Sequence, residues 1–152
     1  QTRMHTEHMG GSLLYIAPEV HRGQHFDTGC DVYAMALIAW ELLTLQRPFH
    51  EFQEHMLPGL VGWGAQRPSL AQLLEMVESK KDSAEGAALS TLVHAVEAAW
   101  TQQPDARPGL EELHGALATA HAVLSEGNVR HKAGDCVTGG ERIAQEPVRV
   151  MF

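Results

Sequence analysis

Cysteine, basic charge and long apolar runs are all scarce in this sequence, and each shortage excludes a class of protein. Cys30 and Cys136 lie far apart with no other cysteine beside them, which argues against a disulfide framework and a Cys-x-x-Cys metal clip. Lysine and arginine number 11 against 19 acidic residues, so no basic stripe is present to bind nucleic acid. The longest apolar stretch, residues 32–40, is about half of a membrane span.

The chain also lacks a leader-type opening, in which basic residues are followed by an apolar run. We therefore expect an intracellular protein, in the cytoplasm, with no membrane segment in this region. The first residue is Gln rather than Met, and residues 1–12 are typical of the middle of a loop. A fragment of a longer protein is expected.

What is present is enough apolar sequence for one core. The chain has 152 residues, of which 44% are hydrophobic, so a single domain is the default. Residues 1–30 hold scattered glycines and Pro18 without any period, which predicts an extended loop. Residues 31–44 are apolar on every side and predict a helix that is buried all round at the centre of the fold. Thr28 and Asp31 resemble a capping box, so this helix should begin near Thr28.

Four further helical stretches follow. A short helix is expected around residues 51–56 within a loop rich in proline and glycine. Apolar residues at helical spacing predict helices over 70–77, 89–100 and 110–124. Ser69 with Gln72 is expected to cap the first of these, and Gly109 the last, which has acidic residues in its first turn. No strand period is found, so the predicted fold class is mainly α, with residues 31–126 as its core and 127–152 as a flexible tail.

Five motifs occur in one order along the chain. Gly11-Ser12 leads to Ala17-Pro18-Glu19, and 31–36 reads DVYAMA. Residues 40–44 read WELLT before Arg47-Pro48-Phe49, residues 64–68 read GAQRP, and residues 100–108 read WTQQPDARP. In this order the motifs resemble the C-terminal lobe of the protein kinase family, from the end of the activation segment onward, and are closest to tyrosine-kinase-like Ser/Thr kinases.

The resemblance implies the helical C-lobe of the kinase-like fold, with the N-terminal lobe absent. The Gly-rich loop, the V-A-I-K lysine, the H-R-D catalytic loop and the D-F-G motif are not found in the sequence. We therefore expect no catalytic residue and no cofactor in this fragment. ATP and Mg would belong to a full-length parent that phosphorylates protein serine or threonine. Protein substrates or regulatory proteins are the implied partners.

The same resemblance assigns roles to particular residues. It implies a pocket for the substrate residue that follows the phosphorylated one, formed by Ser12, Leu13, Leu14 and Tyr15. The structural motif residues that it implies are Ala17, Pro18, Glu19, Asp31 and Arg107, with Glu19 and Arg107 forming a buried ion pair. Two unrelated surface charges remain the alternative for that pair, and an ordinary first-turn acid remains the alternative for Asp31. Thr2 and Thr6 lie where activating phosphorylation often occurs, although an ordinary loop threonine is favoured at each.

Two other functional hypotheses stay open. A pseudokinase or a truncated helical binding module would keep the docking surfaces without catalysis, and an unrelated helical protein would require the ordered motifs to be coincidence. The upstream coding sequence would separate a kinase fragment from a pseudokinase or truncated binding module. A metal site around His21, His25, Asp27 and Cys30 is not favoured, because no second ligand pair accompanies these loop residues.

Overall fold

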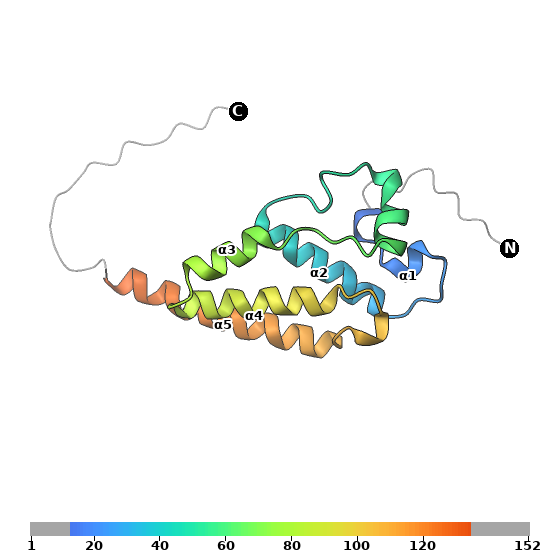
Figure 1. Cartoon of the computed structure of the whole chain (residues 1–152). Coiled ribbons are helices and arrows are strands. Elements are labelled where there is room, and N and C mark those ends of the chain that lie inside the picture. Colours follow the sequence, from blue (N-terminus) through green and yellow to red (C-terminus); the bar gives the residue numbers. More distant parts are fainter. Residues whose placement is uncertain (1–12, 135–152) are drawn as a thin grey trace, which may run out of the picture.

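The computed structural model describes residues 13–134, which form a helical fold (Figure 1). Thr2, Thr6 and Ser12 therefore lie outside the described residues. In the described part helices and turns occur but no strand, which confirms the predicted mainly α class. The elements in chain order are η1 (Leu13–Tyr15), α1 (Pro18–His21), α2 (Gly29–Thr44), η2 (Glu54–Met56), η3 (Pro58–Trp63), α3 (Ala71–Ser79), α4 (Ala84–Ala99), η4 (Pro104–Ala106) and α5 (Leu110–Gly134).

The core lies between α2 and α4. Tyr33, Ala36 and Leu37 of α2 are completely buried, and they pack in one cluster with Val93 and Val96 of α4. In Figure 1, α4 and α5 run side by side, and α3 and α2 lie against the other side of α4. Apolar residues three and four positions apart therefore lie on the inner faces of these helices, as the spacing predicts.

One flank of α2 is exposed, which makes the prediction of a helix covered on both flanks wrong. Met35, Ile38, Leu42 and Leu45 are 39%, 46%, 70% and 87% exposed. The spacing of Met35, Ile38 and Leu42 places them along one stripe of the helix, and Asp31 lies one turn earlier on that stripe. Leu45 follows the helix as its C-cap in the left-handed conformation. Within residues 13–134, no element packs over this apolar stripe, although its composition is typical of a buried surface.

The expected capping box at the start of α2 is also absent. Thr28 is the residue before the helix, but its side chain caps nothing. Asp27 takes this part instead, because its Oδ1 accepts a hydrogen bond of 2.8 Å from the Gly29 backbone N–H. At α3, Ser69 Oγ accepts from the Ala71 N–H at 3.2 Å, whereas Gln72 bonds to Gln46 rather than completing a box.

Several boundaries differ from the predicted ones. The expected loop of residues 1–30 contains two short helices, η1 and α1, in its described part. The glycines and prolines after Met56 predict a loop, yet the short helix η3 forms there. Pro58 is compatible with this helix because it lies in the first turn, where a backbone N–H has no partner within the helix. The helix predicted over 51–56 is only the three residues of η2, while α5 continues past Glu126 to Gly134.

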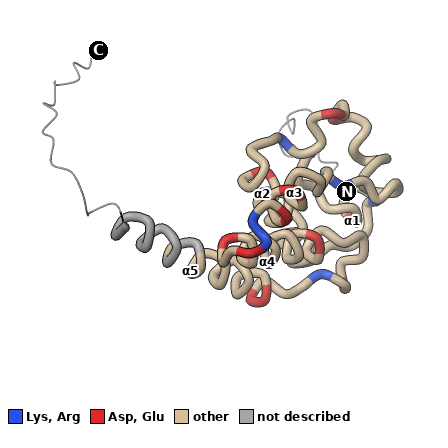
Figure 2. Tube along the Cα trace, turned by 60° about the vertical axis from the view of Figure 1, so that its left-hand side comes forward, with Lys and Arg blue, Asp and Glu red and all other residues tan. Residues whose placement is uncertain are grey.

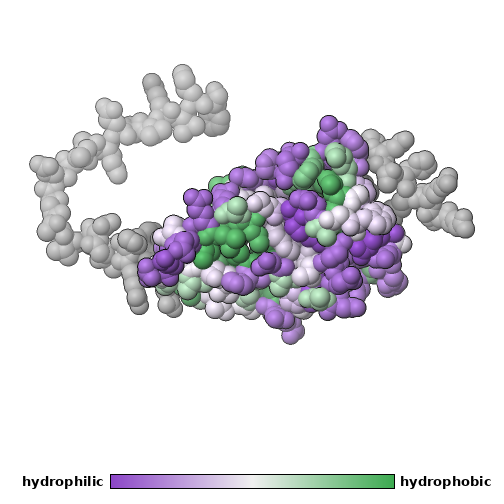
Figure 3. Space-filling model, viewed as in Figure 1, coloured by the Kyte–Doolittle hydropathy of each residue, from purple (hydrophilic) through white to green (hydrophobic). Residues whose placement is uncertain are grey.

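The described surface is mostly polar with two hydrophobic areas on the face shown in Figure 3, one over α3 and one beside η3. Leu74 of α3 and Trp63 of η3 are exposed by 54% and 67%. None of the helices in the described ranges has the length and apolar character to cross a membrane.

Candidate functional site

The segment expected to form a substrate pocket begins at η1. Leu14 is buried in the core, whereas Leu13 and Tyr15 are half-buried. The Tyr15 hydroxyl donates a hydrogen bond of 2.6 Å to Glu41 Oε2 of α2, and this bond raises the pKa of Tyr15, with burial adding to the effect. The contact holds η1 against the C-terminal turn of the central helix.

A groove with a volume of about 490 Å³ opens between the η1–α1 segment and the start of α2. Of the expected substrate-pocket residues that the structure describes, Tyr15 lines it, and Leu13 and Leu14 do not. Asp31 also lines it, with an exposed side chain. The other lining residues are mainly apolar, with one further carboxylate: Ile16, Ala17, Val20, Phe26, Asp27, Thr28, Cys30 and Ala34. A mainly apolar lining with two carboxylates suits a peptide segment that brings both apolar side chains and hydrogen-bond donors.

The expected ion pair between Glu19 and Arg107 is present. Arg107 donates from Nη1 to Glu19 Oε1 at 2.7 Å and from Nη2 to Oε2 at 2.8 Å, which is a bidentate arrangement. The two side chains are only 2% and 1% exposed, and 88 positions separate the residues in the sequence. We call this contact the Glu19–Arg107 latch.

Further hydrogen bonds surround the latch. Arg107 also donates to the backbone carbonyls of Gly29 at 2.8 Å and Thr101 at 3.0 Å, so all three guanidinium nitrogens are used. Cys30 Sγ donates to Glu19 Oε1 at 3.0 Å. The latch therefore joins α1, the start of α2 and the loop before α5 in one network.

The charge state of the network follows from these contacts. Burial acts to raise the pKa of Glu19, but hydrogen bonds from Arg107 and Cys30 outweigh it and lower that pKa to about 2. Burial and the nearby Glu19 carboxylate raise the pKa of the Cys30 thiol to about 12. Glu19 is therefore ionised at neutral pH, whereas Cys30 stays protonated and is a poor nucleophile.

Two contributors to this region were not assigned roles from the sequence, namely Tyr33 and Arg67. The Arg67 and Arg107 guanidinium carbons lie 5.0 and 5.2 Å from the centre of the buried Tyr33 ring. Arg67 also donates to the Trp100 carbonyl at 2.6 Å and to Gln102 Oε1 at 2.7 Å. The Gly64–Pro68 motif marks Arg67 in the sequence, but no local pattern indicates that it meets Tyr33.

In the described part of the chain, no group of three or more histidine, cysteine or acidic side chains is placed to hold a metal ion. His21 Nε2 is buried there without a hydrogen-bond partner, and burial lowers the pKa of His21. A neutral imidazole fits this position better than a charged one.

Comparisons with known proteins agree on one family. Residues 1–117 match the family model for protein tyrosine and serine/threonine kinases. A probable LIM domain-containing serine/threonine-protein kinase from Dictyostelium discoideum is 28% identical over 107 residues, which cover 70% of this chain and 14% of that protein. Human mitogen-activated protein kinase kinase kinase 7 is 27% identical over 111 residues, 72% of this chain and 16% of the relative.

A third relative shows the same partial overlap. The probable serine/threonine-protein kinase SIS8 from Arabidopsis thaliana is 23% identical over 128 residues, or 84% of this chain and 11% of that protein. The chain thus spans less than a fifth of the length of these relatives. The helical fold matches the C-lobe expected from the motifs, and the chain belongs to the protein tyrosine and serine/threonine kinase family.

Proposed function

We propose that this chain is the C-lobe portion of an ATP-dependent protein serine/threonine kinase and is inactive by itself. The observation that carries the proposal is the Glu19–Arg107 latch. It ties the segment that ends in Ala-Pro-Glu to the Arg-Pro segment before α5, as the family resemblance implies. In this role Ala17, Pro18 and Glu19 hold the end of the activation segment in place, and none of the three performs chemistry.

The groove beside the latch is the proposed place for a protein substrate. Ser12 and Leu13 to Tyr15 would support the substrate residue that follows the phosphorylated one, and Asp31 would anchor the catalytic loop of the parent kinase. Thr2 and Thr6 are proposed phosphorylation sites. The parent kinase would act inside the cell, in the cytoplasm, on protein substrates or with regulatory proteins.

The isolated chain is expected not to bind Mg-ATP. Phosphoryl transfer needs a lysine and metal ions on the phosphates and an aspartate beside the acceptor hydroxyl, and the motifs that supply them are not found in the sequence. Calorimetric titration with Mg-ATP should give no heat of binding. A dissociation constant at or below roughly 100 µM, about 5.5 kcal/mol of affinity, would contradict this prediction.

A chimera tests whether the chain can serve as the C-lobe of an active kinase. The chain should restore phosphate transfer to a protein substrate when it follows the N-lobe and catalytic loop of a related serine/threonine kinase. The same chimera with Arg107→Ala serves as its control, because it lacks the latch. A chimera that folds and binds Mg-ATP but transfers no phosphate would favour the helical binding module instead.

The exposed apolar stripe of α2 is consistent with the proposal that this chain is part of a longer kinase, because other parts of that kinase could pack against the stripe. Leu42 is 70% exposed, so Leu42→Gln should change the free energy of unfolding by no more than about 0.5 kcal/mol. The variant should also aggregate less at high concentration, because an exposed apolar stripe promotes association. Thermal melts and light scattering measure both effects. Leu37→Gln, at a completely buried position of the same helix, is the matched control and should unfold the chain.

A further inference from the structure

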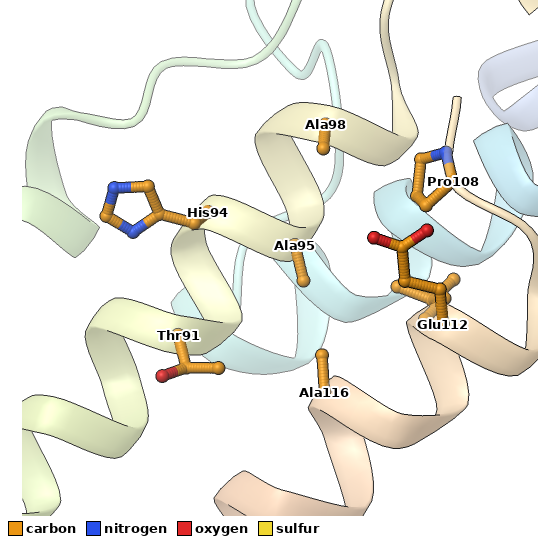
Figure 4. A pocket seen from close by; sticks show the side chains of 8 residues that line it. Thr91, His94, Ala95, Ala98, Pro108, Glu112 and Ala116 are labelled. Carbon is orange, nitrogen blue, oxygen red and sulfur yellow. The ribbon is translucent and has the colours of Figure 1, made fainter. Parts of the chain in front are cut away.

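A second groove, distinct from the one beside the latch, lies between α4 and α5 and has a volume of about 240 Å³ (Figure 4). Its floor is built from small or apolar side chains of both helices and of the loop before α5: Ala95, Ala98, Pro108, Leu113 and Ala116. Thr91 of α4 and Glu112 of α5 add polar atoms at its rim. His94 also lines the groove, but its ring points away from α5 in Figure 4. We call it the α4–α5 groove.

The Thr91 hydroxyl at the rim of the α4–α5 groove is placed as a hydrogen-bond acceptor. Thr91 Oγ1 donates its proton to the Ala87 carbonyl at 3.0 Å, which leaves only lone pairs on the hydroxyl. His94 Nδ1 lies 2.7 Å from the Ser90 carbonyl oxygen. Because a carbonyl oxygen only accepts, Nδ1 is the donor in this contact.

Glu112 supplies the charge. In the part of the chain that the structure describes, no cationic side chain pairs with its exposed carboxylate. Residues 84–99 and 110–125 of the two helices contain no lysine or arginine, and Glu97, Glu111 and Glu112 are acidic. Glu85 of α4 pairs with Lys80. The basic residues of α5, Arg130 and Lys132, come four and more turns after Glu112 in the sequence. Figure 2 shows the same imbalance, because acidic residues outnumber basic ones over the described fold. A ligand for this groove should therefore be cationic.

We infer that the α4–α5 groove binds an arginine side chain of a partner protein. The aliphatic part of arginine would lie on the alanine floor, as long basic side chains do on apolar surface. Its guanidinium would meet Glu112, where two parallel hydrogen bonds to one carboxylate are possible, and its flat face suits the adjacent Pro108 ring. A backbone N–H group of the partner would donate to Thr91 Oγ1. This binding does not depend on the proposed phosphoryl transfer.

The probe for this site is N-acetyl-arginine amide, added to the ¹⁵N-labelled 152-residue chain and followed by NMR. Amide shifts should move at Ala95, Ala98 and Ala116, with a dissociation constant in the millimolar range for so small a ligand. N-acetyl-citrulline amide has the same shape without the charge and should bind about threefold to fivefold more weakly, the size of one exposed ion pair. Equal binding of the two probes, or no shift at these three amides with 20 mM of the arginine probe, on the order of ten times the expected constant, would overturn the inference.

Single substitutions test whether the arginine probe binds in the α4–α5 groove. Glu112→Gln should weaken the arginine probe about threefold to fivefold and abolish its preference over citrulline. Glu75→Gln makes the same change in net charge at an exposed position of α3 and should leave the affinity unchanged. Ala98→Leu fills the groove from an exposed position and should abolish binding while the melting temperature stays near that of the original chain. Equal loss in Glu75→Gln and Glu112→Gln would mean that only overall charge attracts the probe, and the inference would fail.

Discussion

Replacing Arg107 by alanine is expected to lower the free energy of unfolding by about 3–5 kcal/mol. The change leaves the Glu19 carboxylate, only 2% exposed, without its bidentate partner, and a buried unpaired charge is costly. Carbonyl oxygens of Gly29 and Thr101 lose a donor as well. Urea unfolding followed by circular dichroism measures the loss. Since single-domain stabilities are roughly 5–15 kcal/mol, the variant is expected to be partly unfolded at 37 °C.

A double-mutant cycle separates the latch from other effects. Glu19→Ala strands the Arg107 guanidinium in the same way, so the double variant should lose less stability than the sum of the two single losses. The Arg47–Glu54 pair, whose side chains are 54% and 33% exposed, is the matched control and should couple by less than about 1 kcal/mol. Simple additivity at Glu19 and Arg107 would contradict a stabilising latch.

The latch also gives the chain a defined sensitivity to acid. The pKa of Glu19 is lowered from 4.5 to about 2 in the folded chain, so the unfolded chain takes up a proton first as the pH falls. The stabilisation is complete above pH 4.5 and is lost as the pH falls towards 2. In Glu19→Ala this component of the acid transition should be missing, which unfolding measurements across that pH window would reveal.

Replacing Tyr33 by alanine is expected to cost about 3–5 kcal/mol, the usual range for a fully buried aromatic ring. The ring fills the centre of the core and contacts two guanidinium groups, those of Arg67 and Arg107. Without it the two cations would lose their contacts with the ring face and would face a cavity. The loss is measured by the same urea unfolding experiment.

Tyr33→Phe is the matched control and should behave in the opposite way. The Tyr33 hydroxyl is buried, and within the described residues it has no hydrogen-bond partner. Removing it while keeping the ring should leave stability unchanged or raise it by up to about 1 kcal/mol. A loss of more than about 1 kcal/mol in Tyr33→Phe would mean that the hydroxyl has a partner, such as a buried water molecule.

Local patterns predicted most helices because helical spacing of apolar residues depends only on neighbours in the chain. The helices around residues 31–44, 70–77, 89–100 and 110–124 are all found. Their ends were predicted less well, because caps depend on single hydrogen bonds. Asp27 rather than Thr28 bonds at the start of α2, and a π-helical turn forms at Pro58–Trp63 where proline and glycine predict a loop.

The sequence by itself determined the mainly helical class, the order of the kinase motifs and, through the resemblance, the pairing of Glu19 with Arg107. Only the tertiary structure decided what depends on contacts between distant segments. It brought Arg67 and Arg107 against the Tyr33 ring and put Asp31 and Tyr15 in one groove. It also left Met35, Ile38 and Leu42 exposed on α2. The sequence does not show whether another element covers a given apolar side chain. The burial of that side chain is therefore known only from the tertiary packing.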